Sequence, residues 1–277
     1  MKIEFYPLSE QQRQSQQALM TYLLEVYEIT QAEPQVRHVS AQLDALAEKA
    51  RTAIDQTQDL QAQIQQLMQL VYQDWAFVCD EDPYHFPADC LLIDKLLEKK
   101  LGADLSLGAL VLFLAERLNL PLFPVNFSTQ LLLRADIEGK MLLINPVDGQ
   151  TVQQEVLNQW IADYIGFYKL PEIYDISPAD DKALETLKAH LAQHLKNGLI
   201  REERTDEALR YINERLKLNP KNPYEIRDRG LVMATLGCTK EAVADFRFFV
   251  QRCPTDPMAD LLRDQIMGGL DVNYSVH

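Results

Sequence analysis

The sequence is short of cysteine, of long apolar runs and of positive charge, and each shortage excludes a class of protein. No two of its four cysteines form a CxxC pair, so we expect neither a disulfide framework nor a zinc site. The longest apolar run, Leu107–Ala115, has about half of the roughly 20 residues that a membrane-spanning helix needs. Lys and Arg number 27 against 41 Asp and Glu, and the net charge of −14 would repel nucleic acid and anionic membrane surfaces.

The composition that remains is that of a globular protein. Hydrophobic residues make up 47% of the 277 residues, which is enough for a substantial core in one large or two moderate domains. The first residues, MKIEFYPLSEQQRQ, lack the apolar segment of a signal peptide. We therefore expect a soluble, cytoplasmic protein with reduced thiols.

Helical periodicity dominates the first part of the chain. Apolar residues recur at helical spacing over residues 1 to about 76, which predicts several amphipathic helices. The glutamine-rich stretch QTQDLQAQIQQLMQL belongs to this pattern, because its Leu and Ile stripe indicates a helix with one solvated face. A loop with two prolines follows at residues 80–87, and ADCLLIDKLLEKK then predicts a helix that ends near Gly102.

The next segment predicts a helix packed on antiparallel strands. Asp104 or Ser106 can cap a helix from about Leu105 to Leu118. The segments LFPVNF, QLLLRA and KMLLINP are rich in branched and aromatic residues, and DIEGK between the last two predicts a hairpin turn. From Val152 onward the pattern returns to helix.

An internal repeat marks the carboxy-terminal part. Pro220 recurs as Pro254 and Ala208 recurs as Ala242, both at a spacing of 34 residues. Thirty-four residues is the period of tetratricopeptide repeats, and Gly230 fits the small position where paired helices approach each other. The final PMADLLRDQI predicts a capping helix.

These parts together resemble the bacterial transglutaminase-like proteins that end in tetratricopeptide repeats, the SirB-one type. The resemblance covers almost the whole chain and is carried by DCLLIDKLLEKKLGADLSLGALVLFLAERLNLPL, INPVDGQT and NPYEIRDRG. It implies an α+β fold that is mostly α, with a papain-like transglutaminase-like core and a small antiparallel sheet. We expect the N-terminal helices and this core in residues 1–176 and the tetratricopeptide helix pairs in residues 177–277.

The resemblance also locates the catalytic positions of the wider superfamily. That chemistry needs a cysteine thiolate at a helix start, a histidine on the next strand and an acidic residue on the following strand. The corresponding positions hold Ser106, Gln130 and Asn145. A serine hydroxyl needs an adjacent base, and the amide of Gln130 cannot accept a proton at neutral pH, so we expect no catalytic residue among the three.

Two non-catalytic interpretations of these positions stay open. In the first, Ser106 caps its helix, while Gln130 and Asn145 satisfy backbone groups of the strand and the turn. In the second, the three side chains line a polar crevice that binds a partner without reacting with it.

A rival nucleophile provides the alternative function. Cys90 follows FPAD near a predicted helix start, and His85 lies five residues before it in an acidic loop. Acidic neighbours raise the pKa of a thiol, and a cysteine in this position is usually a buried apolar residue. The loop lacks the regular ligand pattern of a calcium site, so we expect no metal. The alternative is a cysteine or serine hydrolase that acts on peptide or amide bonds.

The repeats suggest a partner. NPKNPYEIRDRG places Tyr224, Arg227 and Arg229 around the start of a helix of the kind that lines the concave surface of tetratricopeptide proteins. These groups can clamp a carboxylate of a partner's peptide, or they can form surface salt bridges or contacts to the transglutaminase-like core. We predict a non-catalytic interaction or regulatory protein that binds a protein or peptide, uses no cofactor, and binds neither nucleic acid nor membranes.

Overall fold

The computed structural model describes residues 8–80, 87–127, 130–165 and 176–268. Its contacts divide the chain into two compact units, Met1–Glu25 with Gln35–Ala192, and Val26–Pro34 with Gln193–His277, which we call the first and the second unit. The helix α7 (Asp181–Arg201) has residues in both units. The domain boundary expected at residue 176 therefore stays a prediction.

The chain begins with the predicted amphipathic helices, α1 (Glu10–Thr30), α2 (Val36–Ala53) and α3 (Leu60–Gln69), which belong to the first unit apart from the end of α1 after Glu25. Asp59 caps α3, because its side chain accepts a hydrogen bond from the N–H of Ala62 at 2.8 Å. A single π-helical turn, η1 (Leu70–Asp74), continues α3 without interruption. Such turns displace side chains from the regular α-helical positions and are often found at functional sites.

The continuous helix predicted from ADCLLIDKLLEKK is wrong. A 3₁₀ turn, η2 (Ala88–Leu91), is separated from α4 (Ile93–Lys99) by the extended residue Leu92. The side chains of Cys90, Leu91, Leu92 and Ile93 are all buried, and one helix face cannot bury four consecutive residues. The break in the helix lets these side chains enter the core in different directions.

The end of α4 also differs from the prediction. The helix stops at a left-handed residue, Lys100 with φ 56°, before Gly102 is reached. Gly102 instead belongs to the short strand β2 (Leu101–Gly102), which pairs in parallel with β1 (Val78–Cys79).

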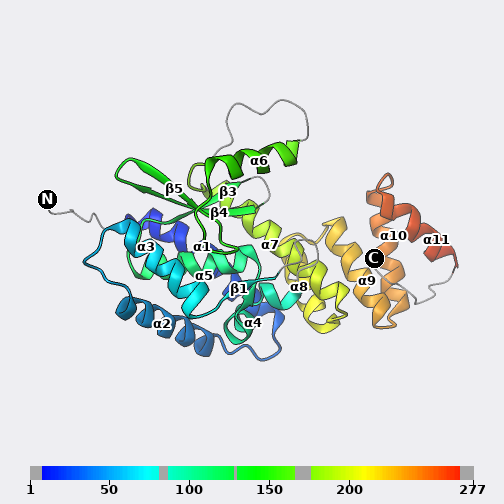
Figure 1. The fold of residues 1–277 in the computed structure, drawn as a ribbon. Helices are drawn as coiled ribbons and strands as arrows, with labels where there is room; N and C mark the ends of the chain where they lie inside the picture. Colours follow the sequence, from blue (N-terminus) through cyan, green and yellow to red (C-terminus); the bar gives the residue numbers. More distant parts are fainter. Residues whose placement is uncertain (1–7, 81–86, 128–129, 166–175, 269–277) are drawn as a thin grey trace. The chain divides into compact units, whose positions relative to one another are not determined.

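The central element of the first unit is α5 (Asp104–Arg117), in which every residue from Leu105 to Glu116 is buried. A helix that is apolar on all sides must be surrounded by other elements. It packs against α2 and α3 and against the strands β3 (Phe123–Phe127) and β4 (Gln130–Ile137), as Figure 1 shows.

The second sheet is antiparallel and has the order β3-β4-β5, with β5 spanning Lys140–Ile144. The predicted hairpin turn is confirmed, since Glu138 and Gly139 between β4 and β5 both have positive φ angles, 50° and 77°. Two such residues form the type I′ turn that suits the twist of a hairpin. The helix α6 (Gln154–Ile165) follows.

The second unit consists of antiparallel helix pairs, and its period is confirmed. After α7 come three helices and a final one: α8 (Thr205–Leu218), α9 (Pro223–Thr235), α10 (Thr239–Arg252) and α11 (Pro257–Gly268). The helices α8 and α10 begin 34 residues apart and also end 34 residues apart. A Cβ atom added to Gly230 would lie 2.6 Å from the ring of Phe246, so a small residue is needed where α9 and α10 meet.

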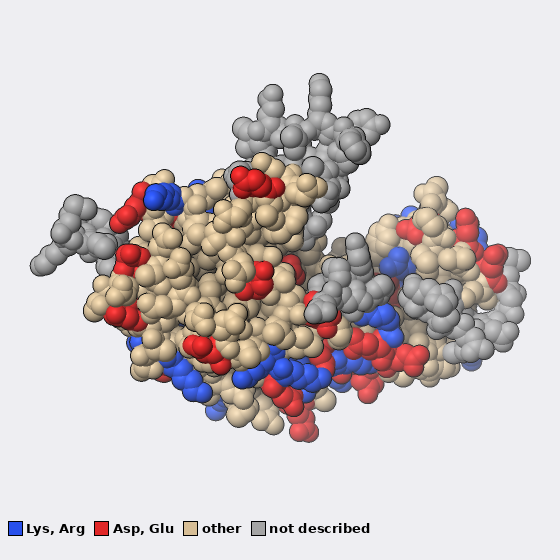
Figure 2. All heavy atoms as spheres, viewed as in Figure 1, with Lys and Arg blue, Asp and Glu red and all other residues tan. Residues whose placement is uncertain are grey.

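The predicted fold class is confirmed: the chain is mostly helical, with a small antiparallel sheet in the first unit and helix pairs with a 34-residue period after it. No helix in the described part of the chain combines the length and the apolarity needed to span a membrane. All four cysteines are among the described residues, and none of them is in a disulfide bond. On the face shown in Figure 2, basic side chains lie beside acidic ones and form no continuous basic patch on the described residues.

Candidate functional site

The segments that carry the three superfamily positions meet in the first unit. Ser106 lies in the first turn of α5, Gln130 begins β4, and Asn145 directly follows β5. A Cβ atom added to Gly108 would lie 2.2 Å from Cδ2 of Leu131 and 3.3 Å from the proline that follows Asn145. The start of α5 therefore packs directly against the neighbours of the other two positions.

The Ser106 side chain is part of the core and 0% exposed. Its hydroxyl accepts a hydrogen bond from the N–H of Ala103 at 2.9 Å and donates to the carbonyl of Cys90 at 2.6 Å. Because Ala103 is the N-cap of α5, Ser106 caps the helix from its third residue and not from the N-cap position that we predicted. The same hydroxyl ties α5 to the 3₁₀ turn η2.

Asn145 organises the turn between β5 and α6. Its Oδ1 accepts the N–H of Val147 at 3.1 Å, its backbone N–H donates to the carbonyl of Gln150 at 2.9 Å, and its carbonyl accepts the N–H of Gly149 at 2.8 Å. Gln130 pairs with Phe127 at the closed end of the β3–β4 hairpin. Their placement is thus that of residues in a strand end and a turn.

The rival nucleophile is placed only in part. Cys90 lies in η2, is 1% exposed, and its Sγ is 4.0 Å from Oδ2 of Asp80. His85 lies outside the described residues, so the pairing of Cys90 with His85 stays a prediction. Among the residues that are described, no three His, Cys, Asp or Glu side chains are placed to hold a metal ion.

A second thiol beside this region was not considered from the sequence. Burial, followed by the charges of Asp104, Asp80 and Asp148, raises the pKa of Cys79 to about 12. Burial, together with the acidic neighbours, therefore keeps this thiol protonated at neutral pH, which is the opposite of what a nucleophilic cysteine requires.

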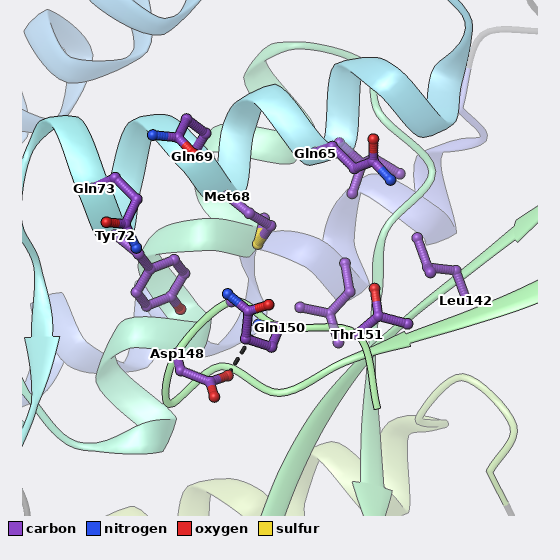
Figure 3. Close-up of a pocket in the computed structure, with 12 residues that line it drawn as sticks. Gln65, Met68, Gln69, Tyr72, Gln73, Leu142, Asp148, Gln150 and Thr151 are labelled. Carbon is purple, nitrogen blue, oxygen red and sulfur yellow. Dashed lines mark hydrogen bonds between the residues drawn. The ribbon is translucent and has the colours of Figure 1, made fainter. Parts of the chain in front are cut away.

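A groove of about 210 Å³ is the feature of the first unit that the sequence did not reveal (Figure 3). It lies between α3–η1 and the end of β5 with the turn after it. Figure 3 shows Met68 and Tyr72 projecting from the helix toward the turn that carries Asp148 and Gln150. Gln65, Gln69 and Gln73 are four residues apart, so the sequence indicated that they share one face of a helix. Nothing in the sequence indicated which turn would lie opposite that face.

In the second unit, the predicted partner-binding residues have internal contacts. Arg229 makes two hydrogen bonds of 2.7 Å to the carboxylate of Asp245. The guanidinium of Arg227 lies 5.4 Å from the centre of the Tyr224 ring and 5.3 Å from that of Phe249. Arg229 is therefore in an ion pair, and so is Arg227, which lies 2.6 Å from the carboxylate of Asp228, whereas Tyr224 is 46% exposed.

A buried ion cluster beneath these residues was also missed. Lys196 of α7 is 2% exposed, and its Nζ lies 3.0 Å from Glu225 and 2.7 Å from Asp228 of α9. A buried lysine needs such partners, and the cluster ties two helices of the second unit together. Helical spacing from the buried Ala192 and Leu199 was a signal for its face of α7, but a charged side chain is not expected to be buried without its partners in view.

Comparisons with known proteins extend these observations. The chain matches the transglutaminase-like superfamily over residues 37–184 and a tetratricopeptide repeat family over residues 195–267. It is 42% identical over 236 residues to a UPF0162 protein of Pasteurella multocida, covering 85% of this chain and 88% of that protein. It is 39% identical over 228 residues to Protein SirB1 of Salmonella typhimurium, covering 81% and 82% of the two chains. No solved structure matches the chain.

Proposed function

We propose, on the premise that the chain belongs to the SirB1/UPF0162 family of transglutaminase-like proteins with tetratricopeptide repeats, that it is a non-catalytic interaction or regulatory protein. In this proposal the first unit keeps the scaffold of a superfamily of enzymes without its chemistry. Both units then serve to bind another protein.

The burial of Ser106 carries the proposal. A nucleophile must reach a substrate carbonyl. The Ser106 hydroxyl is fully buried and donates its hydrogen bond to the carbonyl of Cys90. A general base must accept a proton, and neither Gln130 nor Asn145 can do so at neutral pH. The geometry supports a structural role for all three residues.

The tetratricopeptide helices support the part of the proposal that concerns binding of another protein. Repeats of this kind stack into surfaces that receive other proteins. Tyr224 offers an exposed aromatic side chain there, and Arg227 stacks over its ring. Tyrosine is enriched among the residues that dominate binding energies at protein interfaces, and Arg227, which is paired with Asp228, holds the Tyr224 ring in position.

The experiment is affinity capture of the tagged protein from an extract of its own cells, with captured proteins quantified by mass spectrometry. Wild-type protein, the Ser106→Ala variant and a Tyr224→Ala variant are compared. We expect Ser106→Ala to retain the partners of the wild type, because the hydroxyl touches no partner, and Tyr224→Ala to lose some of them. A folded Ser106→Ala protein that loses every partner would contradict the proposal.

The hydrolase of peptide or amide bonds remains the alternative, and it makes a different prediction. It requires a thiol or hydroxyl with a base within hydrogen-bond reach, and the Cys90–His85 pair is its best candidate. The burial of Cys90 and the acidic surroundings of this region weigh against a thiolate there.

A further inference from the structure

The groove of the first unit has an apolar floor. The side chains of Ile64, Met68 and Tyr72 from α3–η1 and Ile144 from β5 are buried there. Leu142 of β5 is half-buried and lies at the end of the groove away from Asp148, as Figure 3 shows. Because these side chains are largely buried, most of the surface that the groove offers is polar, and an apolar stem can contact the floor only at Met68, Tyr72 and Leu142.

The rim of the groove is polar and carries no positive charge. Among the described residues that line it, the polar ones are amides, a hydroxyl and one carboxylate, namely Gln65, Gln69, Gln73, Gln150, Thr151 and Asp148. Asp148 makes no ion pair with any described residue. The charges of Asp148, Asp104 and Asp80 act together on Cys79, so the field at this end of the groove is negative.

The Asp148 carboxylate is held in place before any ligand arrives. Its Oδ1 accepts the N–H of Gln150 at 2.9 Å, drawn as the dashed line in Figure 3, and its other oxygen remains available. The turn itself is fastened to the helix, because the hydroxyl of Tyr72 donates to the carbonyl of Pro146 at 2.6 Å. A fixed acceptor loses little entropy when it binds, which increases affinity.

Gly149 is required by this arrangement for two reasons. Its φ of +71° is a left-handed conformation that favours glycine, and a Cβ atom there would lie 2.4 Å from the Tyr72 ring. The turn therefore packs its backbone directly on the ring. Asn145, at the superfamily's acid position, supplies three of the hydrogen bonds that shape the same turn.

The dimensions of the groove limit what it can hold. Its volume of about 210 Å³ is below the roughly 300–1,000 Å³ of sites for cofactors and drug-sized ligands. One long side chain fits this size better. Lysine and arginine combine an apolar stem with a charged end, and they commonly lay the stem on apolar surface.

We propose that this groove binds one lysine or arginine side chain of an extended partner segment, with its stem over Met68 and Tyr72 and its charged end at Asp148. The rim glutamines then face the amide groups of the segment's backbone, for which their carboxamides offer both donors and acceptors. This inference rests on the proposed function, because it names the chemistry of the partner that the first unit receives.

The test uses capped amino acids with the full-length protein. N-acetyl-lysine N-methylamide is titrated against ¹⁵N-labelled protein, beside the capped norleucine and capped glutamate analogues, and the amide signals of Gly149, Gln150 and Thr151 are followed. The lysine compound should shift these signals with an affinity at least fivefold higher than norleucine, and glutamate should leave them in place. Raising the ionic strength to about 1 M, where the Debye length is about 3 Å, should remove the preference for lysine.

Variants assign the effect to Asp148. Asp148→Asn should abolish the preference for lysine over norleucine, while Glu155→Gln, which removes a charge from α6 outside the groove, should keep it. Equal shifts with lysine and glutamate, a preference unchanged in folded Asp148→Asn, or shifts confined to other residues would each overturn the inference. The two proposals are tested by different measurements. A probe found chemically altered by mass spectrometry after recovery contradicts the non-catalytic function. Binding at Asp148 is tested only by the changes in the amide signals.

Discussion

The hydroxyl of Ser106 illustrates how a catalytic position can become a structural one. A residue at the start of a helix can point toward the surface or into the core, and here the partner is the carbonyl of Cys90, sixteen residues earlier. The sequence predicted a cap at this position but could not predict that partner, because the break at Leu92 that brings η2 beside α5 depends on core packing. A similar limit applies to Asp148, whose role depends on the helix opposite.

Removing the Ser106 hydroxyl should destabilise the protein without affecting partner capture. Ser106→Ala removes two buried hydrogen bonds, to the N–H of Ala103 and to the carbonyl of Cys90, and these two groups keep only their direct bond of 3.1 Å to each other. We expect the free energy of unfolding to fall by about 1–3 kcal/mol, measured by urea titration. Thr52→Ala, which removes an exposed hydroxyl near the end of α2, is the control and should change it much less. An unchanged midpoint in Ser106→Ala would mean that the hydroxyl does not hold η2 to α5.

The raised pKa of Cys79 predicts a loss of stability at alkaline pH. Burial and three carboxylates raise this pKa from 9.0 to about 12, so between these values the unfolded chain releases a proton that the folded chain keeps. Stability from this group is complete below pH 9 and decreases as the pH rises toward 12. Urea midpoints at pH 8 and pH 10 should therefore differ less in Cys79→Ser than in the wild type. An identical difference in both proteins would show that the thiol titrates normally.

At the scale of elements, the sequence predicted those features that short segments determine. The hairpin turn in DIEGK was predictable because glycine accepts the positive φ that Gly139 has there, and the helix pairs were predictable because residues recur every 34 positions. The groove was not predictable, because α3 and the turn after β5 are about eighty residues apart in the sequence and meet only in the folded unit. The buried Lys196 was missed for the same reason.

The pairing of α9 with α10 should depend on the absence of a side chain at Gly230. Gly230→Ala places a methyl group against the Phe246 ring, and overpacking of this kind costs about 1–3 kcal/mol, partly offset by the ~1 kcal/mol better helix propensity of alanine. We expect a net decrease in thermal stability. Phe246→Leu alone should also destabilise, but the double variant should lose less than the sum of both changes. Strict additivity would indicate that the two residues are not in contact.

For the whole molecule, the negative net charge predicts that nucleic acid is not a partner. A net charge of −14 opposes association with a phosphate backbone unless basic residues gather locally, and on the visible face they alternate with acidic ones. The full-length protein should not retard duplex DNA in a gel at physiological salt, even at the ~100 µM where non-specific binders associate. Retardation that weakens steeply with added salt would contradict this expectation.

The central claim is that the scaffold is kept while the superfamily's chemistry is absent, and the most direct test is labelling of the native protein. The full chain is treated at neutral pH with a serine-reactive fluorophosphonate and, separately, with iodoacetamide, and the modified residues are identified by mass spectrometry. We predict no modification of Ser106 and slow alkylation of Cys90 compared with the exposed Cys238. Rapid, stoichiometric labelling of Ser106, or of Cys90 in a manner lost with His85→Ala, would contradict the claim.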